Sequence, residues 1–169
     1  MWLIPVGMFL LMFSILFLGI QGMLRHVRLV KAAFKEEEGH SFEALKIHFR
    51  KYDVLKRKTG ALFSINSPLY NFAHCDLFIR GDALLLVGRG NGLMKRWGVN
   101  ATVFYRGANA PASPFTKPIP LLDIQLTQQQ LLLEFQPADF PHPIIAVIGI
   151  SKQPEAWECM NNWRGRGEF

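Results

Sequence analysis

Residues 75–89 read CDLFIRGDALLLVGR, two apolar runs on either side of Gly81-Asp82. Each run, Cys75–Arg80 and Ala83–Arg89, has the length and composition of a β-strand. A Gly-Asp pair between two such runs suits the tight two-residue turns that join antiparallel strands. The stretch therefore predicts a β-hairpin near the middle of the chain.

Strand patterns continue beyond this hairpin. Residues Trp97–Tyr105 alternate apolar side chains on one face, which is typical of a half-buried strand. Three more strand-length runs follow: Pro120–Leu126, Gln130–Gln136 and Ile144–Ser151. Before the hairpin, residues 40–60 fit both a helix and a strand, and we favour a short helix or connector. These patterns predict a mainly β domain, a small antiparallel sandwich or barrel of six or seven strands.

The periodicity changes at the C-terminal end. Pro154 suits the first turn of a helix and opens the sequence PEAWECMNNW. Trp157, Met160 and Trp163 fall on one face of that helix. We therefore expect one C-terminal helix to cap the β domain.

The N-terminal end is uniformly apolar. Residues Trp2–Ile20 (WLIPVGMFLLMFSILFLGI) carry no charge, and Ser14 is their only polar side chain. About 20 helical residues span the roughly 30 Å hydrocarbon core of a bilayer. A cleaved signal peptide would have a basic start and a small-residue cleavage site, and both are absent. The run predicts a transmembrane helix, and Leu24, Val27, Val30 and Phe34 continue the helical spacing beyond it.

Basic residues follow the apolar run directly. Arg25, Arg28, Lys31 and Lys35 lie where the positive-inside bias acts. We expect a single-pass protein with its N-terminus outside, its C-terminal domain cytoplasmic, and these four side chains on the membrane surface. A second basic run contains Lys56, Arg57 and Lys58, for which we expect contact with headgroups or a protein partner. Nucleic-acid binding is disfavoured because the chain here is already held at a membrane.

The predicted organisation has four parts: a transmembrane helix (1–24), a basic helix and connector (25–51), a β domain (52–163) and a tail (164–169). The order of elements, with the hairpin of residues 75–89 and the terminal PEAWECMNNW, resembles the pleckstrin-homology-like (PH-like) fold. The resemblance implies a bent antiparallel barrel closed at one end by the C-terminal helix, with Trp157 packed into the open end. It also implies a binding or scaffolding module. The hairpin carries only Arg80 and Arg89, fewer cations than that family's phosphoinositide-binding pattern.

Catalytic signatures are absent from the sequence. It contains no P-loop, G-x-G-x-x-G, H-E-x-x-H or G-x-S-x-G motif. The five histidines are scattered, and the acidic residues are expected mostly on solvated faces or in turns. Cys75 and Cys159 lack zinc-site spacing and are expected to be reduced, unless the domain faces an oxidising compartment, where one disulfide becomes plausible. We expect no enzyme, cofactor or metal site.

These observations favour an accessory or scaffold subunit of a larger membrane complex, with integral membrane proteins as partners. One alternative is a module that binds anionic lipid headgroups at the membrane surface. The other is a membrane-bound enzyme of an unrecognised kind.

Overall fold

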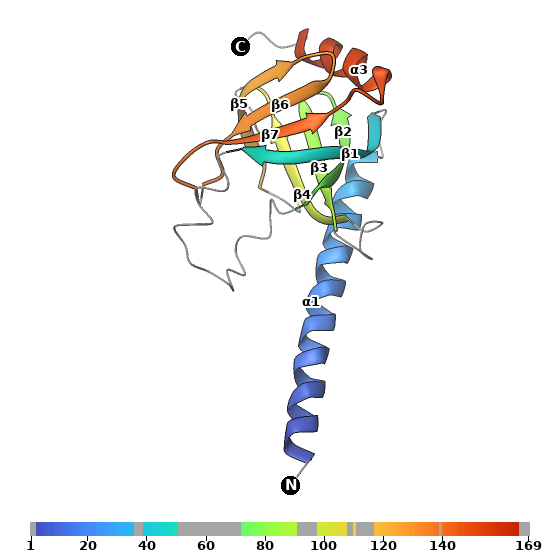
Figure 1. Cartoon of the computed structure of the whole chain (residues 1–169), viewed down its shortest axis with the longest axis vertical. Helices are drawn as coiled ribbons and strands as arrows, with labels where there is room; N and C mark the ends of the chain where they lie inside the picture. The colour runs from blue at the N-terminus through green and yellow to red at the C-terminus, as the bar shows by residue number, and fades with distance from the viewer. Residues whose placement is uncertain are drawn as a thin grey trace.

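The computed structural model describes residues 3–35, 39–50, 72–90, 98–107, 110, 117–138 and 140–165. In these ranges the chain forms a long N-terminal helix, a closed barrel of seven strands and a C-terminal helix (Figure 1). The mainly β fold class with a capping C-terminal helix is confirmed. The elements are α1 (Leu3–Lys35), β1 (His40–Arg50), β2 (His74–Arg80), β3 (Ala83–Arg89), β4 (Gly98–Tyr105), β5 (Ile119–Leu126), β6 (Gln130–Phe135), β7 (Ile144–Gly149) and α3 (Pro154–Gly165).

Strand β1 closes the barrel because it pairs with two neighbours. Its first part is antiparallel to β2, and its last part, from Lys46 to Arg50, is antiparallel to β7. The register with β2 shifts between Phe42 and Leu45, which is a β-bulge. Among the described strands the other neighbours are antiparallel as well, except β4 and β5, which meet in a two-residue parallel contact.

The preference for a helix or connector at the start of residues 40–60 is wrong for residues 40–50. They form β1, in which Leu45 and Ile47 point into the barrel and are buried, while Lys46 between them is exposed. A period of two was present in the sequence, but so was a helical spacing. The partners that decide between them, β2 and β7, lie far away along the chain.

The predicted hairpin is confirmed as β2 and β3, with Gly81 in the turn at φ +52°. Both strands are buried on both faces, not only on the barrel side. The strand predicted at residues 97–105 is confirmed as β4, but the expectation that it is half-buried is wrong, because residues 101–104 are buried on both faces. In β4, Phe104 packs inside the barrel, whereas Ala101 and Val103 are buried outside it, against α1.

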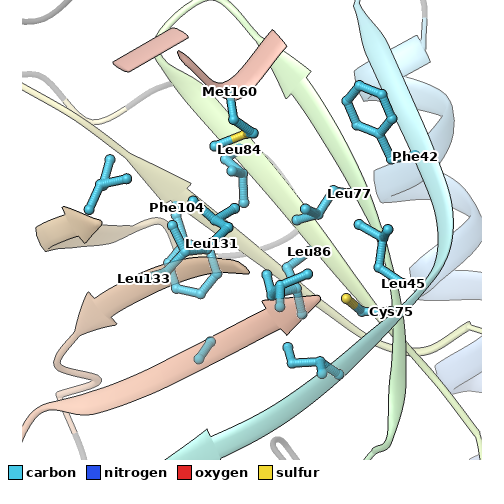
Figure 2. Packing of buried hydrophobic residues seen from close by; sticks show 14 of the residues in the cluster. Phe42, Leu45, Cys75, Leu77, Leu84, Leu86, Phe104, Leu131, Leu133 and Met160 are labelled. Atoms are coloured by element: carbon cyan, nitrogen blue, oxygen red, sulfur yellow. The ribbon is translucent and has the colours of Figure 1, made fainter. Parts of the chain in front are cut away.

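The barrel interior holds the main hydrophobic core (Figure 2). Leu77, Leu84 and Leu133 are fully buried, and each buried side chain of this size contributes about 1.5–3 kcal/mol. At one end of the barrel, Ala156, Met160 and Trp163 of α3 complete the core. Other members labelled in the close view are Phe42, Leu45, Cys75, Leu86, Phe104 and Leu131.

Phe72 is also part of this core and packs over the backbone of β3. Its ring lies edge-on to Phe49, with ring centroids 5.2 Å apart. The ring occupies the space in which Gly88 would carry a side chain, so a Cβ atom there would overlap it. Glycine at position 88 is therefore required by packing.

Candidate functional site

Helix α1 has an exposed apolar part and a part that is docked on the barrel. In the first part the large apolar side chains are at least half exposed: Met8, Leu10, Leu11, Met12, Phe13, Ile15, Phe17 and Leu18. Ser14 satisfies its hydroxyl within the helix by donating to the Leu10 carbonyl at 2.8 Å. By length and composition α1 can cross a membrane, and an 18-residue window within Leu10–Phe34 has a mean hydropathy of 1.6. Apolar exposure of this extent requires a lipid or protein environment.

The docked part begins near Val27. Val27 and Val30 are buried against the outer face of β2, β3 and β4, where they pack with Phe78, Leu85, Val87, Ala101 and Val103. Gly98 makes close approach possible, because a Cβ atom at that position would lie 2.7 Å from Val27 Cγ1. Figure 1 shows α1 continuing without interruption from its free N-terminal end to the barrel wall.

A buried carboxylate joins the helix to the barrel. Asp76, on the outer face of β2, is only 2% exposed. Lys31 Nζ of α1 donates to its Oδ2 at 3.0 Å, and Arg89 Nε of β3 donates to its Oδ1 at 2.6 Å. The Ala44 backbone N–H of β1 donates to the same Oδ1 at 3.0 Å. Four elements thus meet at one carboxylate, and Asp76 departs from the expectation that acidic residues lie mostly on solvated faces or in turns.

The bulge in β1 supplies one of these donors. Ala44 has φ +57°, the left-handed region that a residue with a side chain rarely adopts. This conformation directs its N–H at Asp76 instead of along the ladder. Next to it, Glu43 accepts from Arg89 Nη2 at 3.0 Å. Partial burial alone would lower the pKa of Arg89. Its interactions with Asp76, and to a smaller extent with Glu43, outweigh this effect and raise that pKa above its ordinary value.

The end of α1 is held by a second cation. Arg80 Nη1 of β2 donates to the Ala33 carbonyl at 2.9 Å. Carbonyls in the last turn of a helix lack partners within the helix, and a cation there is stabilising. The guanidinium also lies 6.0 Å from the centre of the Phe34 ring. Polar contacts therefore fix both the position and the rotation of α1 on the barrel.

The four basic residues predicted at the membrane surface are arranged differently from one another. Arg25 and Arg28 are exposed, whereas Lys31 is directed to Asp76. Lys35 is the last residue of α1. Lys56, Arg57 and Lys58 lie outside the described residues.

Helix α3 is fastened to the barrel by Trp163 and Arg106. Trp157, predicted from the resemblance to pack into the open end, is partly buried and lies against the core, while Trp163 is buried. Trp163 Nε1 donates to the Gly81 carbonyl at 2.7 Å. Arg106 stacks on the Trp163 ring at 4.1 Å and donates to the Arg164 carbonyl at 3.1 Å.

Asp76 and Arg106 are the residues that sequence reasoning missed. Asp76 had a signal, since it is a carboxylate inside an apolar strand, where an unpaired charge would be costly. Arg106 had none, because its partners, in α3 and at Asp82 of the β2–β3 turn, lie far from it along the chain.

Two surface hollows differ in chemistry. One, of about 410 Å³, lies beside α3 and is lined by Glu155, Glu158, His40 and an apolar floor that includes Phe42. The other, of about 440 Å³, lies where β1 passes from β2 to β7 and contains Lys46, His48, His74 and Gln130. Across the described ranges no group of three or more His, Cys, Asp or Glu side chains is arranged to hold a metal ion.

Both cysteines are free thiols, Cys75 buried in the core and Cys159 partly buried. Burial raises the pKa of the Cys75 thiol well above its ordinary value, and the nearby charge of Asp76 raises it further, against the opposing effect of Arg89. Cys75 is therefore not an activated nucleophile.

Comparisons with known proteins give no relative. No protein-family model matches the chain, and no curated protein or solved structure is significantly similar to it. The functional inference therefore depends on the geometry described above.

Proposed function

We propose that the protein is a single-pass, membrane-anchored scaffold subunit that holds a PH-like barrel at the cytoplasmic face of a membrane. The observation that carries this proposal is the division of α1. One uninterrupted helix is apolar and exposed along its first part. Along its last part, Val27 and Val30 pack on the barrel and Lys31 forms an ion pair with it. A flexible tether would have neither the continuity nor the buried ion pair.

Dimensions support the anchoring role. The helical residues before Arg25, starting at Leu3, extend about 33 Å at 1.5 Å per residue, close to the roughly 30 Å hydrocarbon thickness of a bilayer. Arg25 and Arg28 are exposed directly after this stretch, at the height where headgroups would lie. The barrel contact begins at Val27, so a membrane around the apolar stretch would have the barrel immediately above its headgroups.

The cytoplasmic orientation rests on the basic residues that flank the apolar stretch. It is tested by replacing exposed Lys152 with cysteine in a chain that also carries Cys75→Ala and Cys159→Ser. In intact cells a membrane-impermeant maleimide should leave this position unlabelled, and labelling should appear after permeabilisation. Labelling of this position in intact cells would show that the domain faces the outside instead of the cytoplasm.

The PH-like assignment is supported by the bent β1 shared between β2 and β7, and by the helix α3 that closes one end. A barrel built this way presents a rigid outer surface, while α1 presents apolar side chains around its whole circumference. The two surfaces suit a subunit that contacts other membrane proteins both within the bilayer and above it.

The test of the scaffold role is purification from native membranes in a mild detergent, after confirming that alkaline carbonate does not extract the protein. We expect the chain to migrate on a native gel with stoichiometric partner proteins, well above its own 19.3 kDa. A Gly98→Leu variant pushes the barrel away from Val27. It should remain in the membrane but lose those partner proteins that contact both α1 and the barrel. Migration of the native protein as a lone monomer would remove the scaffold proposal.

A further inference from the structure

The hollow between β1, β2 and β7 lies on the outside of the barrel. Lys46 is at its centre, because it pairs with His74 of β2 on one side and with Gly149 of β7 on the other. Leu45 and Ile47 point into the core, so Lys46 and His48 point outward. In the same way Cys75 points inward, and its neighbour His74 points outward.

The hollow exists because Gly149 has no side chain. A Cβ atom there would find only Lys46 within 4 Å, at 3.8 Å from its carbonyl oxygen and 3.9 Å from its Cβ. These are ordinary van der Waals distances, so a larger residue would fit the backbone and fill the space. Val147, next on the outward face of β7, is 1% exposed and lines the bottom of the hollow. The result is a concavity of about 440 Å³ with an apolar floor.

The rim has the chemistry of an anion site. Its polar side chains are Lys46, His48, His74 and Gln130, and none of the described residues that line the hollow is a carboxylate. An ammonium group, imidazole N–H groups and an amide N–H₂ can all donate to oxygens of a single anion. A cation is disfavoured because Lys46 would repel it. The hollow beside α3 is the opposite case, with Glu155 and Glu158 in its lining.

We propose that this hollow binds a phosphate group, preferably the dianion of a phosphomonoester, between Lys46, His48 and His74. Lys46 and His48 of β1 and His74 of β2 share one outward face, so their donors can reach separate oxygens of one tetrahedral phosphate. The ligand is either a free phosphate compound or a phosphomonoester lipid headgroup. This inference holds whether or not α1 spans a membrane.

The test uses the full chain in phosphatidylcholine nanodiscs and follows the ring signals of His48 and His74 by NMR. Sodium phosphate is added at constant ionic strength, with sodium chloride as the reference. We expect saturable shifts of both rings with phosphate and none with chloride. A second set of nanodiscs contains either phosphatidic acid, a phosphomonoester, or phosphatidylserine, a phosphodiester. Saturable shifts of the two rings with sodium phosphate, but with neither lipid, identify a free phosphate compound as the ligand. Shifts that occur only in nanodiscs with phosphatidic acid identify a phosphomonoester headgroup.

Two variants test the location of the site. Lys46→Ala removes the ammonium group, and Gly149→Leu fills the hollow without a backbone clash; each should weaken binding at least tenfold. Lys152→Ala removes an exposed cation elsewhere and should leave binding unchanged. Thermal melts of the three variants confirm that the barrel is folded. Absence of shifts with every phosphate source would overturn the proposal, as would shifts that persist unchanged in both Lys46→Ala and Gly149→Leu.

Discussion

Asp76 shows how a single residue can decide the relative position of two parts of a protein. A carboxylate that is 2% exposed is tolerated because donors from α1, β1 and β3 surround it. A buried ion pair is weak evidence for added stability, because desolvation offsets much of the attraction. Its effect here is on specificity, since sliding or rotating α1 would leave the charge of Asp76 without Lys31.

Replacing Asp76 with asparagine should therefore destabilise the folded protein. We expect a loss of about 2–3 kcal/mol in unfolding free energy, less than the 3–5 typical of fully buried pairs, because Lys31 and Arg89 keep some access to water. Chemical denaturation of the detergent-solubilised protein measures it. The matched control is Asp82→Asn, which removes a carboxylate that is 75% exposed from its contact with Arg106 and should cost less than about 1 kcal/mol. Equal effects of the two substitutions would contradict the role assigned to Asp76.

The two thiols should differ in reactivity. Burial raises the pKa of Cys75, so the reactive thiolate is suppressed in the folded state, whereas Cys159 is partly exposed. In a Cys159→Ser variant, maleimide at pH 8 should leave the native chain unlabelled and add one label after denaturation. Because the exposed thiol of the unfolded chain ionises first, stability should fall as the pH rises through the ordinary thiol range. Rapid labelling of native Cys75 would show that this part of the core opens.

At the scale of elements, the contact between Phe72 and β3 is expected to be sensitive to one methyl group. Gly88→Ala places a Cβ atom in the space of the Phe72 ring, and we expect a cost of about 1–3 kcal/mol from overpacking. Gly149→Ala makes the same change in β7, where the new Cβ atom would make only ordinary van der Waals contacts. It should change the unfolding free energy very little. Thermal unfolding of the two variants distinguishes them. Similar melting temperatures would mean that Phe72 does not pack over Gly88.

Elements with a local signal were predictable from the sequence. The turn at Gly81-Asp82 identified the β2–β3 hairpin, and Pro154 identified the start of α3. Strand β1 was not predictable, because its identity depends on pairing with β2 and β7 rather than on its own pattern. The continuation of α1 was visible in the spacing of Val27 and Val30, but its partner was not. Strands β2, β3 and β4 gave no sign that their outer faces would be covered.

The candidate site was less predictable than the fold. Arg25 and Arg28 are exposed and their contact with a membrane surface stays a prediction, whereas Lys31 belongs to the ion-pair network. The phosphate hollow combines residues from four strands, β1, β2, β6 and β7, and its cause is the absent side chain of Gly149. Neither arrangement can be read from spacing along the chain, because both depend on strand register.

At the scale of the whole molecule, α1 and the barrel should move as one body. Within the described residues, the apolar contact of Val27 and Val30 and the Asp76 network join α1 directly to the wall of the barrel. A rigid connection of this kind sets the distance and orientation of every barrel surface relative to the apolar part of α1.

The most direct test is the distance between spin labels on the two parts, measured by pulsed electron paramagnetic resonance in nanodiscs. The labels replace exposed Gln21 of α1 and exposed Lys152 beside α3, in a chain carrying Cys75→Ala and Cys159→Ser. A rigid connection predicts one narrow distance distribution, which broadens when Asp76→Asn and Lys31→Met are added. A distribution that is already broad in the chain with an intact Lys31–Asp76 pair would contradict the account.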